Sequence, residues 1–234
     1  MTQLHLSPDE IQALWLSVKV ATWCVLLGLI PAIGLAWLLA RCEFWGKSLL
    51  EALVLLPLVL PPVVPGYFLL LLFGRQGAIG AWLDQYGIQV AFHWTGAVLA
   101  SLLMCLPLFV QSIRLSLQQQ DIRLEQAAQL LGASRLRVFF TVTLPLCWSG
   151  ILVGAVLAFG RSLGEFGATI TFVGNINGET RTLPLAIYSA IQNPAGEALA
   201  LRLIALSVGL AFAALLIGNW LNQRHQSRLG HRHA

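Results

Sequence analysis

Five long runs of apolar residues, separated by shorter polar segments, dominate the pattern of the chain. In order they are about 11–40, 49–73, 94–113, 142–159 and 201–221. Each approaches or exceeds the roughly 20 apolar residues with which a helix crosses a bilayer core. The pattern predicts an all-α, polytopic transmembrane helical bundle with about five spans. A sixth span would require a division of the first run or of the segment 161–200.

The composition also places the chain in a membrane. Hydrophobic residues make up 57% of the sequence and charged residues only 10%, whereas soluble domains carry about a quarter charged residues. No G-x-x-x-x-G-K-[S/T] phosphate-binding loop occurs, so we expect neither a nucleotide site nor enzyme activity in this chain. The His, Cys, Asp and Glu residues show no metal-ligand spacing, and we expect no metal. The net charge of +4 arises from arginines in loops, and we expect no nucleic-acid partner.

The basic residues between the apolar runs indicate how the chain crosses the membrane. Most lysines and arginines lie in the segments 41–47, 114–137 and 222–234, which share one side if five spans alternate. By the positive-inside rule that side is the cytoplasm. We therefore predict an external N-terminal segment at 1–10, a membrane domain at 11–221 and a basic cytoplasmic tail at 222–234.

The polar insertion 121–145 predicts a helix–turn–helix elbow over 121–140, outside the bilayer. Asp121 is a good N-cap, Gly132 stands where a helix ends in a left-handed residue, and Ser134 can cap a second helix through 136–140. Small alanines at the tip let the backbone of another protein approach closely, so we interpret the elbow as a docking knob. The alternative is an amphipathic loop that lies on the membrane surface.

The second apolar run contains a cluster of prolines, at Pro57, Pro61, Pro62 and Pro65. Proline removes a backbone donor and obstructs the preceding turn, so this span must kink or break near mid-membrane. Discontinuous helices often line transport routes. The alternative is a packing kink without a role in the pathway.

Two ionisable residues, Arg161 and Glu165, follow the fourth run. Four residues apart on a helix, they would share a face and pair, which an ion at membrane depth requires. Together with Phe166 they are either a gate at the far end of the pathway or an ion pair that fixes the depth of the helix. A membrane enzyme that uses Glu165 as acid or base is a third hypothesis, but no nucleophile–base pair accompanies that residue.

The elbow resembles a known signature. Gln126-Ala127-Ala128, Gly132, Val142 and Leu144-Pro145 match, in spacing, the E-A-A-x3-G-x9-I-x-L-P signature of type I binding-protein-dependent ABC importer permeases. Gln126 replaces the usual Glu, Glu125 lies one position earlier, and Val142 replaces Ile. In that family the elbow is a coupling helix that enters a cleft of a cytoplasmic ATPase. The resemblance implies these ATPase-coupling residues: Glu125, Gln126, Ala127, Ala128, Gly132, Leu144 and Pro145.

Three further runs, 56–67, 161–176 and 178–188, look closely like molybdate ABC transporter permeases, and the resemblance covers nearly the whole chain. It implies an alternating-access importer of the bacterial inner membrane, in which two copies of the chain pair. ATP and Mg would be bound by separate ATPase subunits, and a periplasmic or surface-tethered protein would deliver the oxyanion. Sulfate and tungstate permeases share much of the pattern and remain alternatives. An ion-driven secondary transporter is a rival of another class, but the inverted repeats and mid-span charged relays of such proteins are not seen.

Overall fold

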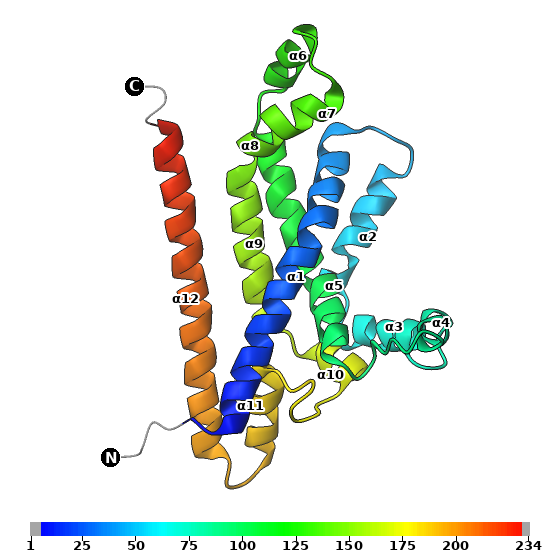
Figure 1. Cartoon of the computed structure of the whole chain (residues 1–234), viewed down its shortest axis with the longest axis vertical. Coiled ribbons are helices and arrows are strands. Elements are labelled where there is room, and N and C mark those ends of the chain that lie inside the picture. The colour runs from blue at the N-terminus through cyan, green and yellow to red at the C-terminus, as the bar shows by residue number, and fades with distance from the viewer. Residues whose placement is uncertain (1–5, 231–234) are drawn as a thin grey trace.

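The computed structural model describes residues 6–230, with side chains described up to Arg224. Helices account for all the regular structure of this part of the chain (Figure 1). They are α1 (Pro8–Arg41), α2 (Lys47–Val59), α3 (Val63–Phe73), α4 (Ala78–Asp84), α5 (Trp94–Gln118), α6 (Ile122–Leu130), α7 (Arg135–Val138), the π-helix η1 (Phe139–Thr143), α8 (Leu144–Leu146), α9 (Trp148–Leu163), α10 (Gly167–Val173), α11 (Leu183–Gln192) and α12 (Glu197–Gly230).

The helices supply up to five membrane spans. Three are long and apolar enough alone, namely α1, α5 and α12, and two more are bent pairs: α2 with α3, and the segment Arg135–Leu146 with α9. This agrees with the predicted count of about five. The helix boundaries differ from those of the predicted spans. Helix α1 begins already at Pro8, α9 begins at Trp148 rather than near Val142, and α12 continues to Gly230.

The centre of the bundle is α5, which packs against both α1 and α9. Small residues belong to this core, including the fully buried Ala32, Ala36 and Ala100, and the fully buried Phe109 of α5 lies against Gly28 of α1 and Gly154 of α9. Lipid tails are as apolar as these side chains, so close van der Waals packing rather than the hydrophobic effect holds such helices together. By contrast, α12 stands at the edge against α9 and α11, and most of its apolar side chains are exposed on the bundle surface.

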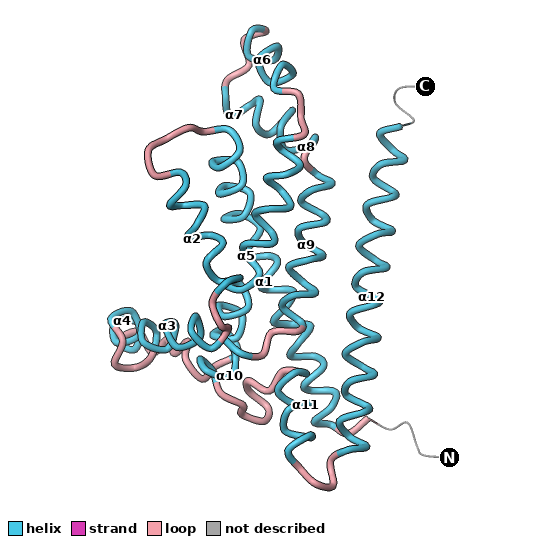
Figure 2. Tube along the Cα trace, turned by 180° about the vertical axis from the view of Figure 1, so that it is seen from behind, coloured by secondary structure: helices cyan, strands magenta, loops and turns pink. Residues whose placement is uncertain are grey.

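The two ends of the bundle differ. At one end α6 and α7 project beyond the long helices, and at the other α10, α11 and the start of α1 lie together (Figure 1). Here the hydroxyl of Ser17 accepts a hydrogen bond from the backbone N–H of Leu183 at 2.7 Å, and the side chain of Gln12 donates to the carbonyl of Gly178. Seen from behind, α3 and α4 extend sideways from the bundle (Figure 2).

Candidate functional site

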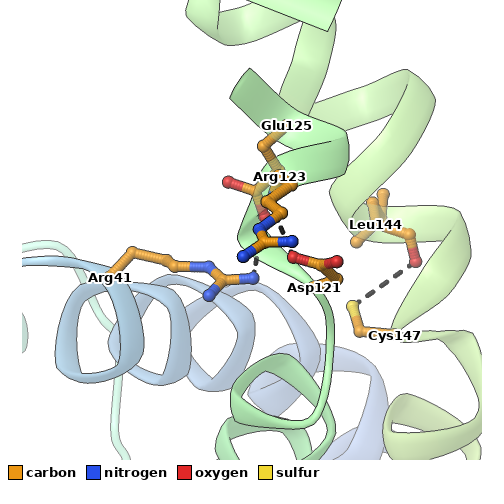
Figure 3. A network of polar contacts seen from close by, with 6 residues as sticks. All are labelled: Arg41, Asp121, Arg123, Glu125, Leu144 and Cys147. Atoms are coloured by element: carbon orange, nitrogen blue, oxygen red, sulfur yellow. Dashed lines mark hydrogen bonds and ion pairs between the residues drawn. The ribbon is translucent and has the colours of Figure 1, made fainter. Parts of the chain in front are cut away.

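The first leg of the elbow, α6, forms as the sequence predicts. The side chain of Asp121 accepts a hydrogen bond from the backbone N–H of Arg123 at 2.9 Å and so caps the helix (Figure 3). Gly132 follows the helix with φ +88°, a conformation that costs L-residues with a side chain energy. The hydroxyl of Ser134 then accepts from the N–H of Arg137 and caps α7. These local hydrogen bonds fix the ends of both helices at the turn, so the elbow has a well-defined conformation.

The second leg differs from the single helix that the sequence predicts. After α7 the chain passes through η1, in which the N–H of Leu144 reaches the carbonyl of Phe139 five residues earlier. Pro145 has no N–H to donate, and its ring would collide with a carbonyl of the preceding turn, so an insertion of this type is the expected response. The helix axis then bends by 66° between Leu146 and Trp148. Leu144 and Pro145 therefore mark the joint between the elbow and α9.

The exposed surface of the elbow carries apolar side chains among polar ones. Gln126 and Ala127 are exposed, and Leu130 and Leu131 are 89% and 90% exposed. No residue of α6 is buried within this chain. Exposed apolar side chains of this kind are typical of interaction sites.

Glu125 behaves differently from its neighbours. Its carboxylate accepts from the guanidinium of Arg41, the last residue of α1, at 2.9 Å (Figure 3). The two side chains are only 14% and 12% exposed. Among the residues of α6 expected to couple to an ATPase, Glu125 thus has a side chain engaged inside the chain, in an ion pair.

The proline cluster breaks the second span, as predicted. Pro57 lies inside α2, Pro61 and Pro62 lie in the break, and Pro65 lies in the first turn of α3. The backbone of Leu60 is extended, and the two helices meet at 111°. The change of direction is much larger than a kink, so α3 leaves the direction of the bundle.

The far side of the break is packed against α10. A Cβ on Gly66 would lie 2.6 Å from the carbonyl oxygen of Ala168, and a Cβ on Gly167 would lie 2.6 Å from Pro62. Backbone therefore meets backbone at this crossing. The packing brings the proline break next to the segment that follows Arg161, although about a hundred residues separate them.

Arg161 and Glu165 do pair, with Nη1 2.6 Å from Oε2. The pairing was expected from their spacing on one helix, but α9 ends at Leu163 and Glu165 lies beyond it. Glu165 is only 2% exposed, and its other oxygen accepts from the N–H of Ala168 at 2.9 Å. The carboxylate therefore links the end of α9 to the start of α10. Phe166, which follows it, contacts the ring of Tyr188 on α11 at 5.1 Å between centroids.

Sequence reasoning missed the polar contacts between distant segments, of which three bear on the long helices. They are Arg41 with Glu125, Arg114 with Glu51 on α2, and Ser17 with the N–H of Leu183. A serine inside an apolar span and a carboxylate at the start of one were the available signals. Neither signal names a partner, because the partners come together only when the helices pack.

The comparisons with known proteins agree with this geometry. A family model described as "Binding-protein-dependent transport system inner membrane component" matches residues 32–227. The chain belongs to this family. It is therefore an inner-membrane component of a transport system, and the resemblance found at the elbow is confirmed at the level of the family.

Several relatives of this inner-membrane component match almost end to end. The "Molybdenum transport system permease protein ModB" of Escherichia coli strain K12 is 57% identical over 226 residues, covering 96% of this chain and 99% of that protein. The ModB protein of Haemophilus influenzae is 56% identical over 222 residues, covering 94% of this chain and 97% of that protein. The "Sulfate transport system permease protein CysW" of Escherichia coli strain K12 is 37% identical over 223 residues, covering 94% of this chain and 76% of that protein.

Solved structures confirm the fold class. A bacterial alginate ABC transporter in complex with its alginate pentasaccharide-bound periplasmic protein has a TM-score of 0.75 at 19% identity, covering 93% of this chain and 80% of that one. The MetNI methionine ABC transporter in inward-facing conformations has a TM-score of 0.69 at 14% identity, covering 94% of this chain and 99% of that one. At these identities the likeness concerns the polytopic helical bundle alone.

Proposed function

We propose that this chain is the membrane-spanning permease subunit of an ATP-driven importer that takes up molybdate by alternating access. The observation that carries the proposal is the capped elbow beyond one end of the bundle, which exposes Ala127 and the apolar side chains of Leu130 and Leu131 beside the polar Gln126. The anion is supported by the 57% identity to a molybdenum permease, against 37% to a sulfate permease.

The proposed assembly contains two copies of this chain in the bacterial inner membrane, surrounded by lipid. Each elbow docks on a cytoplasmic ATPase subunit, which binds ATP and Mg and hydrolyses the nucleotide. A periplasmic or surface-tethered oxyanion-binding protein delivers the substrate to the outer mouth. In this orientation the N-terminus is outside and the C-terminus inside, as the distribution of basic residues favours.

The mechanism requires a rigid knob and a bundle with two stable arrangements, because an effector shifts an equilibrium only through contacts that differ between the two states. The caps of α6 and α7 supply the rigidity. The joint at Pro145 and the 111° break between α2 and α3 supply positions at which helices can reorient. Arg161, Glu165 and Phe166 lie at the end of α9 remote from the elbow, beside that break, where we place the outer gate.

Sulfate and tungstate are the alternative substrates, and the identity to the sulfate permease keeps sulfate as the second candidate. An ion-driven secondary transporter is not supported, since the family depends on a binding protein for transport.

The test is reconstitution of the permease in proteoliposomes with its ATPase subunit and its oxyanion-binding protein. We expect ATP-dependent uptake of radiolabelled molybdate, with tungstate and sulfate as competitors that rank the anions. Uptake by the permease alone, without an ATPase, would overturn the proposal. ATP-dependent uptake of radiolabelled sulfate without uptake of radiolabelled molybdate would reassign the substrate.

Docking is tested by Ala127→Arg and Gly132→Asp at the elbow. We expect both variants to remain in the membrane and to lose hydrolysis stimulated by the binding protein, because a bulky cation or a strained turn disturbs the docking surface. Ala81→Arg is the matched control, because Ala81 is also exposed on a short helix, α4, away from the elbow. Normal transport by the two elbow variants would remove the docking role.

A further inference from the structure

The pair Arg41–Glu125 joins a membrane helix directly to the docking knob. Arg41 ends α1 and Glu125 lies in the first turn of α6. A cation at a helix C-terminus and an anion at a helix N-terminus each complement the helix dipole. The 2.9 Å contact, with both side chains largely shielded, adds a connection between two elements 84 residues apart in the sequence.

A second contact lies one turn earlier on the same face of α1. Trp37 meets Phe139 of η1 edge to face, with ring centroids 6.1 Å apart and planes at 84°. Residues four apart on a helix are neighbours, so Trp37 and Arg41 present one surface. Through this surface α1 contacts both legs of the elbow. Towards the other end of the same helix, Ser17 accepts a hydrogen bond from the N–H of Leu183, the first residue of α11.

We infer that Glu125 is a positioning residue, which fixes the coupling helix on the end of α1 through Arg41 and does not contact the ATPase. The inference rests on the proposed function. The carboxylate is paired through Oε1 and its side chain is only 14% exposed, so the chain itself covers most of the surface that a partner subunit would contact. Its neighbour Gln126, about 100° further around the helix, is exposed and belongs to the docking surface. Movement of the elbow then moves α1 with it.

The test uses charge reversal and exchange in the full transporter: Arg41→Glu, Glu125→Arg and the two together. Three quantities are measured, namely retention of the ATPase subunit during purification, basal hydrolysis, and hydrolysis stimulated by the binding protein loaded with molybdate. We expect the single variants to retain the ATPase and to lose stimulation by roughly fivefold or more, the range of typical coupling energies. The exchange should recover most of the stimulation. Glu43→Lys is the control, because the Glu43 side chain is 88% exposed in its pair with Lys47.

Two results would overturn the inference: loss of the ATPase subunit in Glu125→Arg but not in Arg41→Glu, or an exchange no better than the single variants. If a reversal prevents folding, Glu125→Gln and Arg41→Gln with their double variant answer the same question, and additive losses contradict the pair. Failure of the proposed function itself has a different signature, which is normal stimulated hydrolysis in Ala127→Arg.

Discussion

Replacement of Glu165 tests whether one buried carboxylate fastens α9 to α10. In Glu165→Ala, the N–H of Ala168 loses its acceptor and the guanidinium of Arg161 loses its partner. A lost helix cap costs about 1 kcal/mol. A buried ion pair broken from one side costs about 3–5 kcal/mol, which we reduce to about 2–3 because Arg161 is 28% exposed and water screens it. The expected loss is therefore about 3–4 kcal/mol.

Glu165→Gln separates the two contributions. The amide oxygen of glutamine still accepts from Ala168, so only the charge is lost and the expected destabilisation is smaller. The double variant Arg161→Gln with Glu165→Gln should be less destabilised than the sum of the two single variants, because neither charge is then left unpaired.

The assay is thermal unfolding of the purified permease, followed with a thiol-reactive dye. Cys24, Cys105 and Cys147 are free and buried, so they react as the bundle opens. At roughly 2–4 °C per kcal/mol for a chain of this size, Glu165→Ala should lower the melting temperature by about 6–16 °C. A shift below about 2 °C, or equal shifts for the alanine and glutamine variants, would refute the reasoning. In transport, exchange of the two charges should recover only part of the activity lost by single reversals, because arginine cannot accept from Ala168.

Two further predictions concern packing between segments. Gly66→Ala should separate α3 from α10 and reduce uptake as well as thermal stability, because the new Cβ would lie 2.6 Å from the carbonyl oxygen of Ala168, and overpacking costs about 1–3 kcal/mol. Ser17→Ala should cost about 1–3 kcal/mol, since it leaves the buried N–H of Leu183 without an acceptor; hydrogen exchange in α11 should then be faster. Gly160→Ala is the matched control for the first variant, because its Cβ would meet nothing within 4 Å.

The controls also define the contradicting results. A melting temperature of Gly66→Ala equal to that of Gly160→Ala would show that the crossing tolerates a side chain. For Ser17, the control is Thr22→Ala, whose hydroxyl is exposed and bonds only to its own helix. Equal exchange rates in α11 for the Ser17 and Thr22 variants would contradict the role of the bond to Leu183.

The sequence by itself determined those features that depend on neighbouring residues. The apolar runs predicted the spans, Asp121 and Ser134 predicted the caps of the elbow, and the prolines predicted the break in the second span. A cap bonds within a few residues, and a proline alters its own turn, so no knowledge of the rest of the fold is needed for either.

The tertiary structure alone decided where those elements lie relative to one another. That α3 turns by 111° to lie against α10, and that Glu165 caps α10 rather than sitting on α9, follow from the packing of segments distant in sequence. The packing of distant segments likewise decides that Glu125 points inward, because its partner Arg41 belongs to another helix. Side chains of one type and spacing can face outward or inward, and only the close approach of the helices selects between the two.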